Sequence, residues 1–190
     1  MIYPIVAYGH PNLRKIAVDI DKDYPNLDKF IESMYESMYE SNGVGLAAPQ
    51  VNRSIRLFVV DATPFSDEIP EPIEFKRVFI NAKIIERTGD DWAFQEGCLS
   101  VPGINEEVMR PAKIRIQYYD ENWEFHDEYF DDIPARIIQH EYDHLEGILF
   151  VDRLSPLRKT ILKGKLMDIA KGKTKVSYRM IYPKLKNKRK

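Results

Sequence analysis

The sequence predicts an α+β fold with antiparallel sheets, an N-terminal helix and a C-terminal amphipathic helix. Apolar residues recur at helical spacing near both ends of the chain and in one central segment, and alternating segments typical of strands lie between them. These elements do not alternate regularly along the chain, which argues against a parallel α/β fold. A length of 190 residues with 44% hydrophobic residues suits one globular domain with a sizeable core.

The N-terminal helix is expected over residues 25–42. Pro25 suits its first turn, and the Asn42-Gly43 pair is a stop signal. Large apolar side chains at spacings of three and four predict one face packed on the core. This face consists of Leu27, Phe30, Ile31, Met34, Tyr35, Met38 and Tyr39.

The first strands follow a segment with very little side-chain bulk. Residues 43–50 include two glycines, two alanines and a proline, so another backbone could approach them closely. A buried strand is predicted over residues 55–60, and extended chain over residues 78–85. Between them, residues 63–76 contain three prolines and several acidic groups, which favours a surface loop.

A β-hairpin is predicted from two alternating segments, residues 113–119 and 123–129, joined by a turn over residues 120–122. Alternation places every second side chain on the same face of a strand. The first segment places Ile114, Ile116 and Tyr118 on one face, and the second continues the alternation with Trp123, Phe125 and Tyr129.

Two more helices are expected after this hairpin. Asp132 suits an N-cap, with Pro134 in the first turn and Gly147 as the stop signal. The pair Ser155-Pro156 opens the C-terminal helix, in which lysines occupy most of the remaining positions. Its predicted apolar side consists of Leu157, Ile161, Leu162, Leu166 and Ile169.

The sharpest chemical signal is the segment His140-Glu141-Tyr142-Asp143-His144. Helical residues four apart lie one above the other on the same face, so His140 and His144 could bind one metal ion. Glu141 would then reach a water molecule on that metal. The alternative is a pair of histidines in an ordinary helix, but this helix is otherwise apolar, and buried histidines need polar partners. The pattern therefore predicts a metal centre.

A catalytic centre of the zinc type usually has three protein ligands and an open position for water. One metalloprotease pattern, HExxHxxGxxH, has a histidine where this chain has Phe150, although Gly147 is present. No glutamate follows Glu146, so the downstream glutamate of thermolysin-like enzymes is excluded. On that side of the helix the remaining candidates for a third ligand are Asp152 and Asp168.

Upstream of the helix, Cys98 is the strongest candidate. A lone cysteine is usually a small buried hydrophobe. Here Gly97 removes bulk beside it, and Glu96 is a polar group in a stretch otherwise poor in charge. A thiolate with two imidazoles is a known catalytic set for a borderline metal. His10, in a turn, and His126, on a polar strand face, are interpreted as surface residues.

Charge is distributed unevenly along the chain. Residues 1–152 carry 14 Lys+Arg against 29 Asp+Glu, a net charge of −15, whereas residues 153–190 have a net charge of +13. The basic end suggests a partner of its own, and the acidic body argues against general nucleic-acid binding. A single cysteine excludes an intrachain disulfide and fits a reducing compartment. With no visible secretory signal and no long apolar run, we expect a cytoplasmic protein without a membrane anchor.

Three separated segments resemble the peptide deformylase family. Its motifs GxGLAAxQ, EGCLS and QHExDHLxG occur here in the same order, at residues 43–50, 96–100 and 139–147. Residues 9–14 are also similar to the family's N-terminal segment. The similarity predicts a catalytic domain over residues 1–170, followed by a basic C-terminal tail over residues 171–190.

The resemblance implies hydrolysis of N-formylmethionyl peptides to formate and a free N-terminal methionine. It also implies a fold in which antiparallel sheets surround the central metal-binding helix. The implied metal is Fe²⁺, with Zn²⁺, Ni²⁺ or Co²⁺ as possible substitutes. By similarity, the metal ligands are Cys98, His140 and His144, the catalytic acid and base is Glu141, and the donors that stabilise the carbonyl are Gln50 and the backbone N–H of Leu99.

Substrate contacts are predicted along the low-bulk segment and around the cysteine, at Gly43, Val44, Gly45, Glu96, Gly97 and Ile137. Ile137, one turn before Glu141, is expected to form a wall of the pocket for the methionine side chain. The resemblance also implies an ion pair between Glu96 and Arg110. The chain departs from the family where an arginine often follows the cysteine motif, because Gly103, Ile104 and Asn105 occupy that stretch.

The implied partners are N-formylmethionyl nascent peptides and, through the basic C-terminal segment, the ribosome. Two alternatives belong to other classes. The first is a metallopeptidase that uses Asp152 or Asp168 as its third ligand, and replacement of Cys98 would distinguish it from a deformylase. The second is a binding protein on an inactive deformylase scaffold, against which the intact Glu141 and Gln50 argue.

Overall fold

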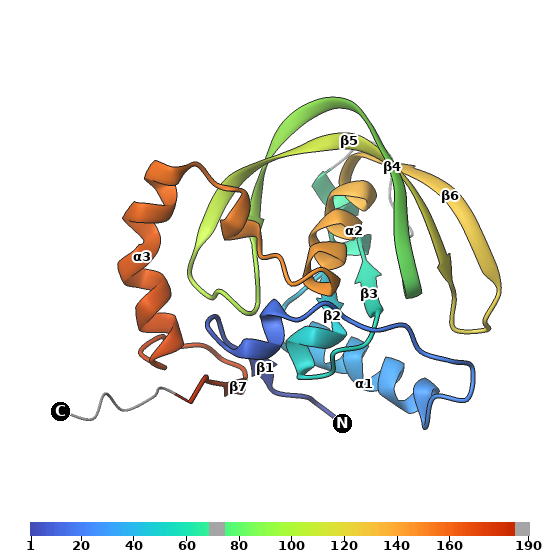
Figure 1. The fold of residues 1–190 in the computed structure, drawn as a ribbon, viewed down its shortest axis with the longest axis horizontal. Coiled ribbons are helices and arrows are strands. Elements are labelled where there is room, and N and C mark those ends of the chain that lie inside the picture. Colours follow the sequence, from blue (N-terminus) through green and yellow to red (C-terminus); the bar gives the residue numbers. More distant parts are fainter. Residues whose placement is uncertain (69–74, 185–190) are drawn as a thin grey trace.

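A five-stranded antiparallel sheet organises the chain in the computed structural model, which describes residues 1–68 and 75–184 (Figure 1). Its strands follow the order β2-β3-β4-β5-β6 across the sheet, so β2 is an edge strand. They are β2 (Gly45–Ala47), β3 (Leu57–Asp61), β4 (Lys76–Gly97), β5 (Asn105–Tyr119) and β6 (Phe125–Asp131). The α+β class and the antiparallel sheet predicted from sequence are confirmed.

The strands β4 and β5 are much longer than the sequence pattern suggested. They pair from Ile80 and Tyr119 to Gly97 and Asn105, and register shifts interrupt the pairing at three places. These irregularities let the strands bend into the arch seen above the central helix in Figure 1. Residues 86–91 of β4 are all exposed, so no buried face gives this part of the strand an alternating pattern.

The predicted hairpin is β5–β6. Ile114, Ile116 and Tyr118 are buried, as expected from their alternation. Phe125 and Tyr129 face outward instead, with exposed fractions of 56% and 64%. The alternation predicted for this segment is confirmed, because exposed and partly buried residues alternate along β6. Phe125 and Tyr129 lie on the exposed side, whereas Phe130 packs against the core.

Helix α2 (Asp132–Leu145) lies under the arch and packs against β2, β3, β5 and β6 (Figure 1). It begins at Asp132, so Asp131, and not Asp132, is the N-cap residue. The helix ends at Leu145, and Gly147, the predicted stop signal, follows two residues later with a φ of +70°. The helix contributes to a core of aliphatic and aromatic side chains that includes Ile133, Ile137, Ile138, Leu145, Phe58, Phe79, Ile114 and Ile116. The central position expected for this helix is confirmed.

Helix α1 (Leu27–Glu40) covers a second core on the other side of β2 and β3. It lies within the predicted residues 25–42 and is shorter by two residues at each end. Asn26 and Asn42 flank it in the left-handed conformation, which asparagine tolerates better than most residues. Of the predicted apolar face, five residues are buried, Tyr35 is partly buried and Tyr39 is 44% exposed. The Tyr39 hydroxyl donates a hydrogen bond to Asp61.

Helix α3 (Pro156–Ala170) begins as predicted, with the Ser155 side chain accepting a hydrogen bond from the Arg158 N–H. Its buried side is narrower than the sequence pattern suggested. Leu162, Leu166 and Ile169 are buried, but Leu157 and Ile161 are 69% and 58% exposed. The helix packs against a third core cluster through Leu162, Leu166 and Ile169, so its buried side is narrow.

The two ends of the described chain meet in a small parallel ribbon. Strand β1 (Ile5–Val6) pairs with β7 (Met180–Ile181) near the base of the molecule (Figure 1).

Short 3₁₀ turns complete the fold at Pro11–Arg14, Ala48–Val51, Thr63–Glu68 and Phe150–Arg153. The Thr63–Glu68 turn begins the predicted 63–76 loop, and residues 69–74 of that loop lie outside the described residues. Within the described ranges, none of the helices combines the length and apolarity needed to cross a bilayer.

Candidate active site

The two histidines of α2 and the single cysteine meet at one point. His140 and His144 lie one turn apart on the helix, and Cys98 follows directly after the end of β4. Ligand atoms of the three side chains lie within 4.8 Å of one another, and Cys98 Sγ is 3.4 Å from His144 Nε2. One sulfur and two imidazole nitrogens this close suit a borderline divalent metal. The residues present therefore fit the metal centre expected from the sequence.

The two aspartates considered as alternative third metal ligands have other partners in the structure. Asp152 pairs with Arg14 and accepts a hydrogen bond from the Leu149 N–H. Asp168 lies on α3 and pairs with Lys173. Among the described residues, the metallopeptidase alternative with an aspartate as the third ligand therefore has no support.

A carboxylate fixes the orientation of His140. Its Nδ1 is 2.9 Å from an oxygen of Glu96, so Nε2 is left to face the cysteine and the second histidine. A carboxylate that bonds to the second ring nitrogen of a metal-binding histidine fixes the orientation of the ring and determines which nitrogen carries the proton. Burial alone would raise the pKa of Glu96, but hydrogen bonds from Arg110 and His140 outweigh this effect and hold the pKa well below its ordinary value. Glu96 is therefore an ionised carboxylate behind the site.

The ion pair between Glu96 and Arg110 is confirmed, at 2.7 Å, and it belongs to a larger buried network. Arg110 also reaches Asp143 at 2.7 Å, and Arg136 reaches Glu96 at 3.1 Å. Arg153 completes the pairing of Asp143 from the side of the 3₁₀ turn. This network ties the end of β4, the middle of β5 and the helix α2 together.

Arg136 and Asp143 were not among the site residues predicted from the sequence. Both are buried, with exposed fractions of 2%. A signal was available, because positions 136, 140 and 143 share one face of the helix, and polar side chains at such spacing interrupt an otherwise apolar surface. A polar stripe inside a buried helix predicts partners on the elements around it.

Glu141 lies beside the three ligands and is almost fully buried. Its Oε2 has no hydrogen-bond partner among the described residues, which is uncommon for a buried carboxylate. Burial raises the pKa of Glu141 to about 7. Gly45 explains how the carboxylate fits, since a Cβ atom at that position would lie 2.5 Å from Glu141 Oε1. The small residue in the low-bulk segment thus makes room for a polar side chain of the site.

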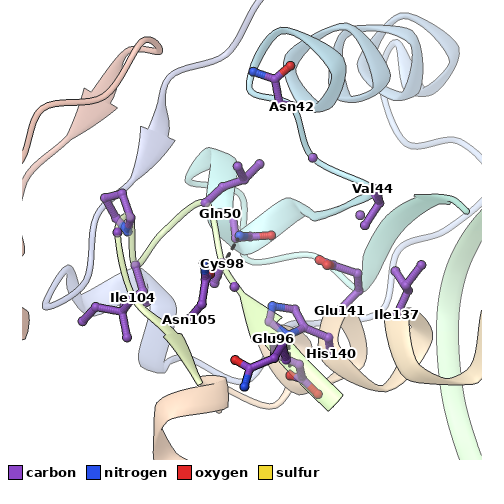
Figure 2. Close-up of a pocket in the computed structure, with 18 of the residues that line it drawn as sticks. Asn42, Val44, Gln50, Glu96, Cys98, Ile104, Asn105, Ile137, His140 and Glu141 are labelled. Atoms are coloured by element: carbon purple, nitrogen blue, oxygen red, sulfur yellow. Dashed lines mark hydrogen bonds and ion pairs between the residues drawn. The ribbon is translucent and has the colours of Figure 1, made fainter. Parts of the chain in front are cut away.

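Gln50 points its amide toward the same centre from the 3₁₀ turn that follows β2 (Figure 2). Its Oε1 accepts a hydrogen bond from the Ala47 N–H at 2.8 Å, which leaves Nε2 as the inward-facing donor. This nitrogen lies 3.5 Å from Cys98 Sγ and 3.3 Å from Ser100 Oγ. The amide is therefore held at one end and presents its N–H groups at the other.

A cavity of about 480 Å³ opens over these groups (Figure 2). Every residue predicted to contact substrate lies on its wall: Gly43, Val44, Gly45, Glu96, Gly97 and Ile137, together with Gln50, Leu99, Cys98, His140 and Glu141. Ile137, Phe65 and Phe94 also line the cavity, and all three belong to one apolar cluster. Gly103, Ile104 and Asn105 line the cavity where an arginine is often found in the family, and residues 175–178 line it from the C-terminal segment.

The other two histidines, His10 and His126, lie away from the cavity and form hydrogen bonds within turns. His10 Nδ1 accepts a hydrogen bond from the Asn12 N–H at the start of a 3₁₀ turn. His126 stacks on Tyr118 and lies 2.9 Å from Asp120, which also accepts two backbone N–H groups of the hairpin turn. Asp120, Glu124 and His126 are close enough to bind a metal. Hydrogen bonds of the hairpin turn already account for the positions of Asp120 and His126.

Metal-dependent hydrolases combine a ligand set of this kind with a neighbouring carboxylate that no structural partner occupies, and the chain has both. Residues 2–160 match the family model of polypeptide deformylase. The chain belongs to the peptide deformylase family, and its activity is that of a peptide deformylase.

Full-length relatives and solved structures agree with this assignment. The chain is 53% identical to a peptide deformylase of Christiangramia forsetii, with all of both chains covered, and 52% identical to one of Cytophaga hutchinsonii over 96% of this chain and 98% of the relative. Among solved structures, peptide deformylase 1B of Arabidopsis thaliana is 36% identical, with a TM-score of 0.78 over 90% of this chain and 91% of the other. The Plasmodium falciparum enzyme is 39% identical, with a TM-score of 0.79 over 88% and 95%.

Proposed function

We propose that Cys98, His140 and His144 hold the metal of this deformylase, and that Glu141 moves the proton in the reaction. The substrate is the formyl group on the N-terminal methionine of a peptide. The observation that carries the proposal is the buried Glu141 Oε2 without a partner, beside three side chains whose ligand atoms lie within 4.8 Å of one another. A buried acceptor held ready in this way suits a group that works on water.

The ligand set suits Fe²⁺, with Zn²⁺, Ni²⁺ or Co²⁺ as substitutes. When bound, the metal would make water more acidic and withdraw charge from the formyl oxygen. Metal analysis of protein purified without oxygen tests this choice. We also expect the iron form to lose activity in air faster than the zinc form, because oxidation of the Cys98 thiolate would remove a ligand. Equal half-lives of the two forms would contradict iron as the labile metal.

Glu141 has two tasks in the proposed reaction. It accepts a proton from the water molecule that attacks the formyl carbon, and it then delivers that proton to the departing nitrogen. The carbon–nitrogen bond breaks as the nitrogen is protonated, which gives formate and a free amine. The raised pKa of Glu141 suits a group that must both accept and donate a proton near neutral pH.

Gln50 and the Leu99 N–H are the proposed donors to the formyl oxygen as it becomes negative. The hydrogen bond from the Ala47 N–H supports this role for Gln50, since it turns the amide nitrogen toward the site. Each such donor contributes about 3–4 kcal/mol to transition-state stabilisation in well-studied enzymes.

The edge strand β2 supports a binding mode for the peptide backbone. Gly43, Val44 and Gly45 line the cavity, and β2 pairs with β3 on one side only, so an extended peptide could add beside it. Recognition through the backbone would accept many sequences. The methionine side chain would enter the apolar end of the cavity formed by Ile137, Phe65 and Phe94, with Glu96 and Gly97 on the wall nearer the metal ligands.

Replacement of Glu141 by Gln tests the central role. The variant should keep its metal, because Glu141 is not a proposed ligand, and formate release from a formyl-Met peptide should fall by about 10²–10⁴-fold. Replacement of His144 by Gln is the matched comparison on the same helix, and it should lose the metal as well. If the Glu141 variant loses metal in proportion to its activity, Glu141 is a ligand and the assignment is wrong.

We also propose that the basic C-terminal region guides the enzyme to the ribosome in the cytoplasm, where nascent chains carry the formyl group. Residues 153–190 have a net charge of +13, and several exposed lysines of α3 belong to this region, whereas residues 185–190 lie outside the described residues. Each phosphate contact should contribute a slope of about −0.7 to −0.9 to log K against log salt. Removal of residues 184–190 should flatten this slope and leave formate release from a short peptide unchanged. Unaltered ribosome affinity at low salt would contradict the tether.

A further inference from the structure

The C-terminal segment after α3 returns to the active site. Gly172, with a φ of +70°, turns the chain at the end of the helix, and β7 later pairs with β1. Between these two points, Lys175, Val176, Ser177 and Tyr178 line the same cavity as Cys98, His140 and Glu141. These four residues lie beyond residues 2–160, the part that matches the family model.

The loop that carries Cys98 is fixed by three hydrogen bonds to its consecutive carbonyl groups. The Cys98 carbonyl accepts from the Val101 N–H, and the Ser100 carbonyl accepts from the Tyr8 N–H, each at 2.8 Å. The Leu99 carbonyl accepts from the Tyr178 hydroxyl, also at 2.8 Å. Two of these bonds join main chain to main chain, and the third depends on a side chain of the C-terminal segment.

We propose that Tyr178 is a positioning residue for deformylation, because its hydroxyl fixes the Leu99 unit that presents an N–H to the formyl oxygen. The proposal rests on the donor role assigned above to Leu99. The N–H and the carbonyl of one residue are separated by only two backbone torsions, so holding the carbonyl limits the direction of the N–H. An oxyanion donor must be aimed at the place where negative charge develops, and small displacements of a positioned group cost much of the rate.

The backbone around Tyr178 is itself held in place. The next residue, Arg179, accepts a hydrogen bond from the Ile5 N–H at 2.8 Å through its carbonyl. Met180 and Ile181 then pair with Ile5 and Val6. The parallel ribbon therefore anchors the tyrosine within two residues of its Cα atom, and the ring reaches from this anchor to the Leu99 carbonyl. The catalytic unit would thus extend to Tyr178, beyond the boundary at residue 170 predicted from sequence.

Replacement of Tyr178 by Phe tests the proposal, since it removes the hydroxyl and keeps the ring. Replacement of Tyr182 by Phe is the matched control, because Tyr182 lies in the same segment, is 36% exposed and has no hydroxyl hydrogen bond among the described residues. Three quantities are measured on the full-length, metal-loaded proteins. They are kcat and KM for formyl-Met peptides, metal bound per chain, and hydrogen–deuterium exchange of the peptide spanning residues 97–101.

For the Tyr178 variant, we expect kcat to fall about threefold to tenfold, the range that one net hydrogen bond supports, with KM and metal content within about twofold of the parent. Exchange of residues 97–101 should become faster in this variant and stay unchanged in the Tyr182 variant. A purely structural role of the ring would leave kcat per metal-loaded chain and the exchange unchanged, and that result overturns the proposal.

A Gln50→Ala variant separates this inference from the function on which it rests. If the Gln50 variant loses kcat and the Tyr178 variant equals the Tyr182 control, the positioning role is wrong and the proposed donors to the formyl oxygen stand. If both the Gln50 and the Tyr178 variants keep full kcat, the donor assignment itself fails. A loss of kcat in the Tyr178 variant that follows loss of metal also overturns the proposal, because the tyrosine then acts on the metal site and not on Leu99.

Discussion

Helices α2 and α3 have 14 and 15 residues, yet they have opposite surroundings. Helix α2 is enclosed by the sheet, and ten of its residues are buried, including Arg136, Glu141, Asp143 and His144. Helix α3 lies at the periphery with four buried residues, all of them apolar. Burial therefore has two different roles in this enzyme. In α3, buried apolar side chains pack the helix against the rest of the protein. In α2, burial also keeps charged side chains at fixed positions around the metal centre.

The difference predicts that charge removal near α2 is costly. Replacement of Arg110 by Met leaves Glu96 and Asp143 with fewer partners in a buried place, and the free energy of unfolding should fall by about 3–5 kcal/mol. Urea unfolding measures this loss. Replacement of Arg115 by Met is the control, because Arg115 lies on the same strand but pairs with Asp127 at the surface, so the variant should unfold nearly like the parent. Equal stability of the two variants would contradict the importance of the buried network.

A smaller change tests how closely the strand β2 approaches α2. Replacement of Gly45 by Ala places a methyl group against the Glu141 carboxylate, which must then move. We expect kcat for formate release to fall about 100-fold, since displacement of a reacting group by about 1 Å has an effect of that size. Metal content should be unchanged. A Gly164→Ala variant is the control, because Gly164 lies on α3 and a Cβ atom there meets nothing within 4 Å. Full activity of the Gly45 variant would show that Glu141 tolerates displacement.

The smallest effects are expected in α3. Replacement of Leu166 by Ala removes a buried side chain and should lower the free energy of unfolding by about 2 kcal/mol. Replacement of Ile161 by Ala, on the exposed part of the same helix, should change it by less than about 0.5 kcal/mol. Neither variant should change kcat for a short formyl-Met peptide. A large loss of stability in the Ile161 variant would show that this side of α3 is covered in solution.

The spacing of apolar residues along the sequence predicted burial correctly where a helix or strand has a single buried face. The α1 stripe predicted a helix that the structure contains, and the alternation of Ile114, Ile116 and Tyr118 correctly placed them in the core. The same spacing was not enough where burial or strand length depends on an element far away in the sequence. Leu157 and Ile161 satisfy the helical spacing of α3 but are mostly exposed. Strand β4 continues far beyond its alternating part because β5 supplies its hydrogen bonds.

The sequence by itself determined the chemistry of the site. Its spacing placed His140, Glu141 and His144 on one helix, and the three motifs named the family. Only the tertiary structure decided which groups meet this helix. It brought Cys98 rather than Asp152 or Asp168 to the histidines, surrounded Asp143 with two arginines, and returned Tyr178 to the Leu99 carbonyl. The physical reason is the distance along the chain over which each interaction acts. Helical spacing acts over four residues and can be read along the chain, whereas a hydrogen bond between residues 79 positions apart exists only because the fold closes the distance.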